Sequence, residues 1–262
     1  MTESLAKYKN SPVIETVLGV EFKPIIGWQI PHFGLYWNRI RHKYQNCSVQ
    51  PPLPEQVERF SKEPATITIN LTAHNDVRCW FFDENQNWLL QVQNNRFISN
   101  WKRKTPAYPA YEGFCDRFDD QWDRFRDFLS KERLGTPEIL QCEISYVNHI
   151  ELERDFEDLD QIFPAWRGFP EGNMLSKPEA IAFNTVYIIP ENIGRLYIAM
   201  QPVVRHADLK TVIQLAVTAK VKVASKEGYD LKRALKIAHE HVVNGFTNFT
   251  SFKMHELWER VK

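Results

Sequence analysis

Glycine is scarce in this chain, at 10 residues among 262. The glycines are also scattered, whereas a dinucleotide-binding turn needs them clustered so that backbone amides can approach pyrophosphate. The sequence contains neither Gly-Lys-Ser/Thr, which a P-loop requires, nor Gly-x-Ser-x-Gly, which forms the nucleophile turn of an α/β-hydrolase. These absences exclude the phosphate-cradling and serine-hydrolase classes that depend on such turns.

Long apolar runs are absent as well. No run approaches the roughly 20 residues that span a bilayer, and the N-terminal segment is polar where a secretory signal has an apolar core. The cysteines Cys47, Cys79, Cys115 and Cys142 stand far apart in the sequence. This spacing predicts reduced thiols, with no metal knuckle and no redox pair. We expect a cytoplasmic protein that does not enter a membrane.

Neither charge is in excess. The 33 Lys and Arg residues balance the 33 Asp and Glu residues, so the formal net charge is zero. Nucleic-acid-binding domains, by contrast, are usually strongly basic. Hydrophobic residues make up 43% of the chain and aromatic residues 13%, which predicts a folded protein with a sizeable core.

Hydrophobic periodicity predicts the same order of elements in both halves of the chain. The first half has a strand over 13–22, a short helix over 34–44, strands over 66–71, 77–82, 88–93 and 96–101, and a long helix between Pro109 and Gly135. The second half has a strand over 139–150, a short helix over 156–166, strands over 180–189, 195–204 and 211–223, and a long helix from Asp230. The first long helix carries an apolar stripe at spacings of three and four: Phe114, Phe118, Trp122, Phe125 and Leu129.

This order indicates an α+β fold with antiparallel sheets covered by long helices. Its repetition predicts an internal duplication of a strand–helix–meander–helix unit, with one repeat over residues 1–136 and the other over 137–262, within one compact unit. The order resembles the TATA-binding-protein-like or helix-grip topology, an analogy that assigns no function.

Four sequence features together carry a family resemblance: Pro12-Val-Ile-Glu15, Gln50-Pro-Pro-Leu-Pro54, the block over 90–101, and the closing His239, Phe246, His255 and Trp258. The chain resembles a sporadically distributed, uncharacterised prokaryotic family of about 260 residues, the length of this chain. The resemblance covers the whole chain and brings no established catalytic residues. The patchy occurrence of the family resembles that of genes in anti-phage defence or toxin–antitoxin loci.

No group of residues has the spacing of a metal or catalytic site. His239 and His241 are two residues apart on a predicted helix, so they cannot bind one ion together. The acidic run over 151–160 lacks the glycine turn of a calcium loop and suits a solvated linker with a helix N-terminus. Cys79 and Cys142 lie at apolar strand positions, where a thiol behaves as a small hydrophobe. We expect no metal ion and no cofactor.

The most suggestive surface feature is the basic and aromatic stretch over 96–104, with a second such patch over 39–44. Basic side chains can hold phosphates while rings stack on bases, and aromatic anchors also suit protein interfaces. Strand alternation predicts that Phe97 packs inside. The basic cluster Lys102, Arg103 and Lys104, where the chain leaves the strand, is expected to lie exposed at a sheet edge. The candidate residues for contact with a protein partner or nucleic acid are Arg96, Trp101, Lys102, Arg103 and Lys104. A solvated strand end is the alternative.

These observations favour a non-enzymatic binding or accessory protein of the bacterial cytosol that recognises a protein partner or associates with itself. The resemblance places such a protein in a defence or toxin–antitoxin locus. One alternative is a nucleic-acid-binding protein that uses a concave sheet face and the basic-aromatic edge. Another is a protein with a small-molecule pocket between a sheet and its long helix. No recognised motif supplies a catalytic residue.

Overall fold

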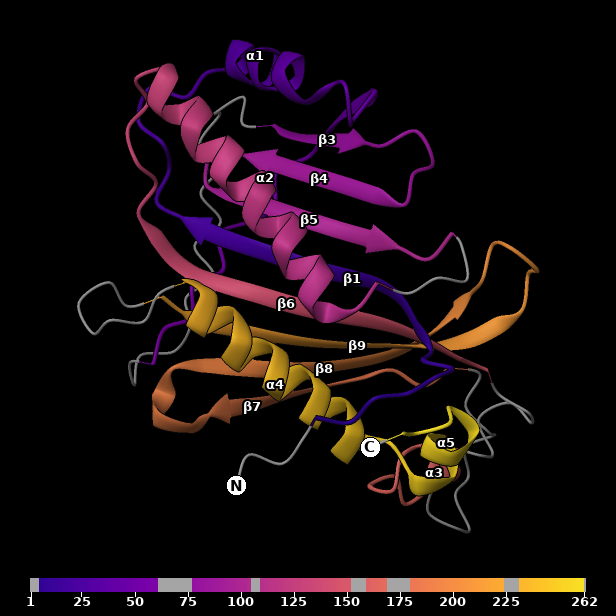
Figure 1. The fold of residues 1–262 in the computed structure, drawn as a ribbon. Helices are drawn as coiled ribbons and strands as arrows, with labels where there is room; N and C mark the ends of the chain where they lie inside the picture. Colours follow the sequence, from indigo (N-terminus) through magenta and orange to yellow (C-terminus); the bar gives the residue numbers. More distant parts are fainter. Residues whose placement is uncertain are drawn as a thin grey trace. The chain divides into compact units, whose positions relative to one another are not determined.

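The computed structural model describes residues 5–60, 77–104, 109–151, 159–168, 180–223 and 231–261. The strands in these ranges are β1 (Val13–Phe22), β2 (Asn46–Gln50), β3 (Arg78–Phe82), β4 (Trp88–Gln93), β5 (Arg96–Lys102), β6 (Ile139–Glu151), β7 (Phe183–Ile189), β8 (Gly194–Val204) and β9 (Thr211–Lys222). The helices are α1 (Ile30–Ile40), α2 (Tyr111–Lys131), α3 (Leu159–Ile162), the 3-10 turn η2 (Pro190–Asn192), α4 (Leu231–Phe249) and α5 (Phe252–Leu257). Figure 1 shows these elements along the chain.

The strands in the described ranges form one antiparallel sheet in the order β2-β3-β4-β5-β1-β6-β9-β8-β7. Mixed helices and antiparallel strands confirm the predicted α+β class. The expectation of more than one sheet is wrong, because β1 is the neighbour of β6 and the hydrogen-bonded order continues from the strands of the first half to those of the second. None of the helices in the described ranges is long and apolar enough to cross a membrane.

Some elements differ from the sequence prediction. α1 begins earlier than expected, because Pro31 suits the first turn of a helix and Gln29 and His32 close its start with reciprocal hydrogen bonds. β2 was not predicted, since its sequence lacks a hydrophobic alternation, but its main chain pairs in register with β3. The predicted strand over 66–71 lies outside the described residues, and so does part of the predicted helix over 156–166.

The chain forms two compact units, each assembled from separate stretches of sequence. Unit 1 contains Met1–Glu15, Ile144–Lys220 and Leu235–Lys262, and unit 2 contains Thr16–Glu143 and Val221–Ala234. The division runs through β1, β6, β9 and α4. The predicted border between residues 136 and 137 separates repeats in the sequence, and it stays a prediction.

In unit 2, α2 lies on one face of the strands (Figure 1), and side chains of its apolar stripe contact β5. Phe97 of β5 lies at the centre of this contact, with ring centroids 6.0 Å from Phe118, 5.4 Å from Trp122 and 4.9 Å from Phe125. The prediction that Phe97 packs inside is therefore confirmed. The predicted stripe is confirmed as well, because all of its residues are buried: Phe114, Phe118, Trp122, Phe125 and Leu129.

In unit 1, α4 packs closely on the strands at Gly245. A Cβ atom at this position would lie 2.7 Å from Cδ2 of Leu196 on β8 and 3.5 Å from Cγ1 of Val217 on β9. A contact of 2.7 Å is shorter than van der Waals packing allows. The missing side chain therefore leaves room for Leu196 to pack against the main chain of α4.

We expect G245A to be less stable than G34A by about 1–3 kcal/mol. Both glycines lie inside helices, where alanine is favoured over glycine by up to about 1 kcal/mol. A methyl group at position 34 meets nothing within 4 Å, whereas at 245 it overlaps Leu196. Urea denaturation of the two variants measures the difference. Equal stabilities would show that α4 does not pack this closely on β8.

Candidate functional site

The structure separates the predicted contact residues into buried and exposed ones. β5 lies between β4 and β1 and is not a sheet edge. This corrects the edge position expected for the end of β5. It also corrects the view of the whole stretch over 96–104 as a surface feature, because Arg96 and Trp101 are only 5% and 3% exposed. Lys102 and Arg103 are half-buried and Lys104 is exposed. A role of these last three residues in partner or nucleic-acid contact stays a prediction.

Arg96 forms a buried ion pair with Glu21 of β1. Its Nη2 atom lies 3.0 Å from Oε1 of Glu21, and the two side chains are 6% and 5% exposed. The same Nη2 atom donates a hydrogen bond of 2.6 Å to the carbonyl oxygen of Pro54. A buried charge is costly unless it is paired and hydrogen-bonded. This guanidinium is therefore committed to groups of the chain itself, not to an external phosphate.

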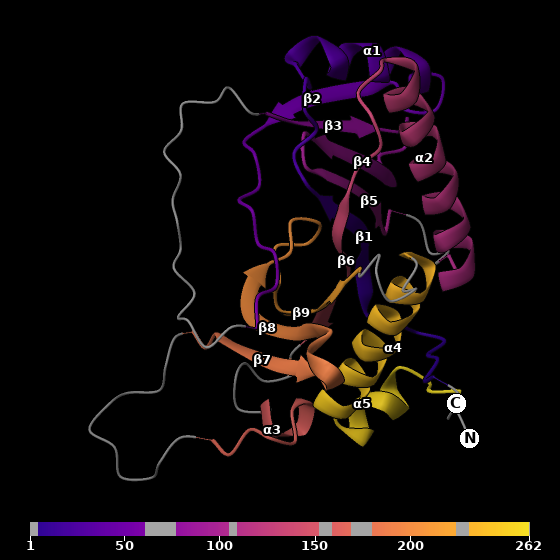
Figure 2. The ribbon, with the colours of Figure 1, turned by 90° about the vertical axis from the view of Figure 1, so that its left-hand side faces the viewer.

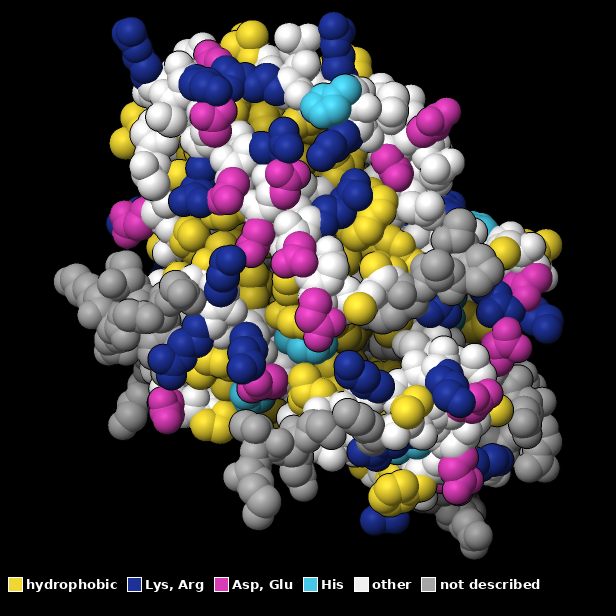
Figure 3. All heavy atoms as spheres, in the orientation of Figure 1, with side chains coloured by type: hydrophobic (Ala, Val, Ile, Leu, Met, Phe, Trp, Pro, Cys, Tyr) yellow, Lys and Arg dark blue, Asp and Glu magenta, His cyan; other side chains and the backbone are white. Residues whose placement is uncertain are grey.

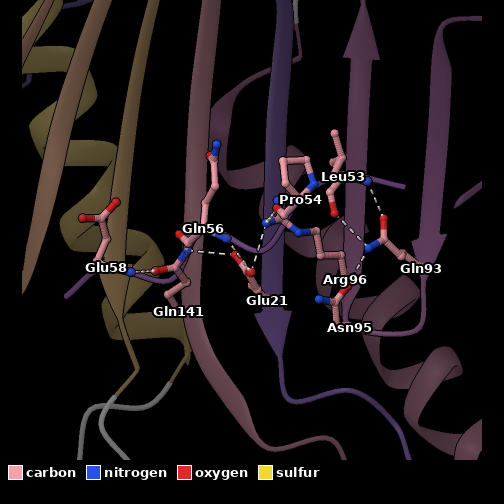
Figure 4. A network of polar contacts seen from close by, with 9 residues as sticks. All are labelled: Glu21, Leu53, Pro54, Gln56, Glu58, Gln93, Asn95, Arg96 and Gln141. Carbon is pink, nitrogen blue, oxygen red and sulfur yellow. Dashed lines mark hydrogen bonds and ion pairs between the residues drawn. The ribbon is translucent and has the colours of Figure 1, made fainter. Parts of the chain in front are cut away.

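Residues 51–60, here called the crossing segment, cross the face of the unit 2 strands opposite α2 (Figure 2). The segment begins with two prolines, which favour extended backbone. Its main chain lies over buried side chains from successive strands (Figure 4), here called the polar row: Gln93 of β4, Arg96 of β5, Glu21 of β1 and Gln141 of β6.

The polar row satisfies main-chain groups of the crossing segment. Oε1 of Gln93 accepts a hydrogen bond from N of Leu53 at 2.8 Å, and Nε2 of Gln93 donates to O of Leu53 at 3.1 Å. Oε1 of Gln141 accepts from N of Glu58 at 2.9 Å, while its Nε2 donates to O of Gln56 at 2.9 Å. These hydrogen bonds are made to main-chain atoms of the crossing segment. They therefore depend little on which side chains the segment carries, and most of those side chains are exposed.

Sequence reasoning identified Arg96 but missed the rest of the polar row. The alternation of Gln91 and Gln93 with Leu90 and Val92 marks a polar strand face, which ordinarily predicts exposure. Gln93 is buried instead, because it bonds to a residue 40 positions earlier in the chain. The polar row binds the crossing segment of the same chain, so its side chains are not a surface for a partner.

His239 and His241 contact different groups of the chain. Nδ1 of His239 lies 3.0 Å from Oη of Tyr146, whereas Nδ1 of His241 donates to the carbonyl oxygen of Ile237 at 2.9 Å. Within the described ranges no three His, Cys, Asp or Glu side chains gather as ligands for a metal ion. The acidic run over 151–160 falls largely outside those ranges.

Two cysteines that the sequence spacing treated as isolated are neighbours. Cys47 of β2 and Cys79 of β3 lie on paired strands, where Cys47 is opposite Phe81 and Cys79 is opposite Val49. Burial raises the pKa of both thiols, that of Cys79 to about 12. Both sulfurs are therefore protonated at neutral pH and are weak nucleophiles.

Charged side chains of both signs are interspersed on the surface over α2 (Figure 3). Asp120 pairs with Arg124 at 3.0 Å and Asp127 with Lys131 at 2.7 Å, each one helical turn away. Neither sign dominates this helix face, so it lacks the basic field with which proteins attract nucleic acid.

Among the described strands, β7 has the longest run of consecutive exposed apolar side chains. Among the strands that the structure describes, β7 is the last in the sheet order and is hydrogen-bonded to β8 along one side. Val186, Tyr187 and Ile188 are 53%, 48% and 61% exposed. Natural edge strands are usually protected by charged residues, prolines or bulges, yet the sequence Phe-Asn-Thr-Val-Tyr-Ile-Ile contains no charge and no proline. β7 is therefore the candidate interaction site.

A scan of protein-family models and a search of curated proteins each found no match to this chain. The resemblance to a prokaryotic family stays a prediction. The function is therefore inferred from the chemistry of the described residues.

Proposed function

We propose that this chain is a non-enzymatic binding protein that recognises a protein partner by pairing an extended segment of that partner with β7. The observation that carries the proposal is an edge strand without charge or proline whose hydrophobic side chains are half-exposed. Such an edge is a template for strand addition, in which main-chain hydrogen bonds supply affinity and alternate side chains supply specificity.

The register of β7 defines the surface that a partner would cover. Val186 lies opposite Tyr197 and Ile188 opposite Arg195 on β8, so the side chains of Val186 and Ile188 share one side of the sheet. Tyr187 points to the other side, because successive strand residues alternate. A strand added to β7 covers both sides. Burying the exposed half of each aliphatic side chain contributes roughly 1 kcal/mol.

The test is a tagged pull-down from the native host with quantitative mass spectrometry, comparing wild type with V186K. A lysine ammonium placed at the edge opposes strand addition, so we expect recovery of the partner to fall about ten-fold or more. V49K is the matched control, because Val49 is a 64% exposed valine on β2, the strand at the other end of the order. A partner recovered equally with both variants would contradict the proposal.

Self-association is distinguished by sedimentation of the purified chain. A wild-type dimer that dissociates in V186K, with no other protein recovered from the host, would identify a second copy as the partner. A dimer that persists in V186K would place self-association away from β7.

We also infer that the fold arose by internal duplication. In the first half the neighbours run β1-β5-β4-β3, and in the second half they run β6-β9-β8-β7, so each half places its first strand beside the last strand of its meander. A long helix, α2 or α4, follows each meander. This correspondence supports the predicted strand–helix–meander–helix repeat and its helix-grip analogy. A setting in a defence or toxin–antitoxin locus stays a prediction from the family resemblance.

A further inference from the structure

A cavity of about 50 Å³ lies in unit 2, beside the C-terminal end of α1 and the middle turns of α2. Its wall includes Tyr36, Tyr44, Arg117 and Gln121. A single buried water needs only about 10–15 Å³, so this cavity has room for a group of several heavy atoms. Part of the wall comes from the basic-aromatic patch over 39–44, which is not part of the proposed partner surface on β7.

Two phenol groups on the wall are hydrogen-bond donors. The side chain of Tyr36 is 1% exposed, and its Oη has no hydrogen-bond partner among the described residues. Oη of Tyr44 accepts hydrogen bonds from Nη2 of Arg117 at 3.3 Å and from Nε2 of Gln121, which leaves its own O–H to donate. Burial raises the pKa of both phenols, so both keep their hydrogens at neutral pH.

Positive charge exceeds negative charge around the cavity. Three cationic side chains, Lys43, Arg117 and Arg124, stand against one carboxylate, that of Asp120. Asp120 is engaged by Nε of Arg124 through two contacts of 3.0 Å. The guanidinium of Arg117 lies 4.0 Å from the ring centroid of Trp88, which orients its plane, and within the described ranges its Nε has no hydrogen-bond acceptor.

The buried amide of Gln121 completes the wall. Gln121 is 6% exposed, and its Oε1 atom has no hydrogen-bond partner among the described residues. Because an amide can turn through 180° and exchange its oxygen for its nitrogen, Gln121 can accept from Tyr44 and direct an N–H into the cavity. In the turned orientation the single O–H of Tyr44 donates to Gln121, and the groups that can donate to one ligand are Tyr36, Arg117 and Gln121. In the original orientation Gln121 donates to Tyr44, and the donors to the ligand are Tyr36, Tyr44 and Arg117.

We propose that this cavity binds a small oxyanion, namely a phosphate group held by Arg117 and the phenols of Tyr36 and Tyr44. Donors that lack acceptors, an excess of positive charge and room for a few heavy atoms all suit such a group. Inorganic phosphate and the phosphate of a mononucleotide offer the same chemistry. A nucleic-acid strand is disfavoured, because the exposed carboxylates of Asp123 and Asp127 lie along the same helix.

Isothermal titration calorimetry of the full chain tests the proposal, with inorganic phosphate as the probe and ionic strength held constant with sodium chloride. We expect saturable binding that weakens about ten-fold or more in Y36F, since a hydrogen bond to a charged ligand is lost. R117Q should weaken binding at least as much. The unfolding midpoint of ligand-free Y36F should match that of wild type, because Oη has no partner to lose.

Exposed residues of the same type provide the controls. Y187F and R126Q change a half-exposed tyrosine and a half-exposed arginine outside the cavity, and both should bind phosphate as wild type does. In a second titration, adenosine monophosphate that binds as tightly as phosphate identifies the phosphate group alone as the ligand, and tighter binding identifies a mononucleotide. Absence of binding with both probes, or wild-type affinity in both Y36F and R117Q, would overturn the proposal.

Discussion

The variant R96M is expected to have a free energy of unfolding about 3–5 kcal/mol lower than wild type. Removing the guanidinium leaves Glu21, which is 5% exposed, as a buried carboxylate without its cation. The carbonyl oxygen of Pro54 loses its hydrogen-bond donor at the same time. Urea denaturation measures the effect as a lower midpoint with an unchanged slope.

Two further variants separate the ion pair from a general effect of losing an arginine. R41M removes an exposed arginine and should change stability by no more than about 0.5 kcal/mol. The double variant E21Q/R96M should regain much of the lost stability, since no charge then remains buried while an acceptor for N of Gln56 is kept. An R96M protein as stable as R41M would show that the buried pair does not hold the crossing segment.

A comparable loss is expected for F97A, again about 3–5 kcal/mol. The ring of Phe97 is fully buried and lies within 6.0 Å of three aromatic rings of α2, so its truncation leaves a cavity between the helix and the strands. Thermal or urea unfolding measures the loss. F252A removes the same side chain from a position that is 81% exposed and should cost less than about 1 kcal/mol. Equal effects of the two variants would be incompatible with this core.

The elements that could be predicted from the sequence are those whose pattern is local. The stripe of α2 repeats every three or four residues, and a helix with that pattern can bury it only against another layer. Phe97 shares one face of β5 with Ser99 and Trp101, opposite Arg96, Ile98 and Asn100, so its direction followed from strand geometry. Both features depend on residues close together in the chain, and the structure has both.

Arg96 was assigned to an exposed surface because the same alternation places it on the face opposite Phe97. That face is exposed in a two-layer fold unless another segment covers it. The covering contact comes from Pro54, 42 residues earlier, and the counter-ion from Glu21 on another strand. Periodicity contains no information on contacts of this kind, so the polar row could not have been assembled from the sequence.

The exposed edge at β7 depends in the same way on the order of strands. The sequence predicted a strand over 180–189, and β7 occupies most of that range. Whether such a strand is central or terminal is decided by pairing with distant strands. The phosphate cavity likewise joins Tyr44, which follows α1, to Arg117 and Gln121 of α2. The basic-aromatic stretch over 39–44, which the sequence suggested as a surface patch, includes the buried phenol of Tyr44.

Photo-cross-linking at β7 in living cells of the native host tests the central claim most directly. Tyr187, which is 48% exposed, is replaced by the photoreactive residue p-benzoylphenylalanine, and Phe252, which is 81% exposed, is replaced in a parallel experiment as the control. If a partner strand adds to β7, irradiation gives a covalent protein adduct from position 187 and little or none from position 252. No adduct from position 187, or the same adducts in equal amounts from both positions, would contradict the assignment of β7 as the partner-binding edge.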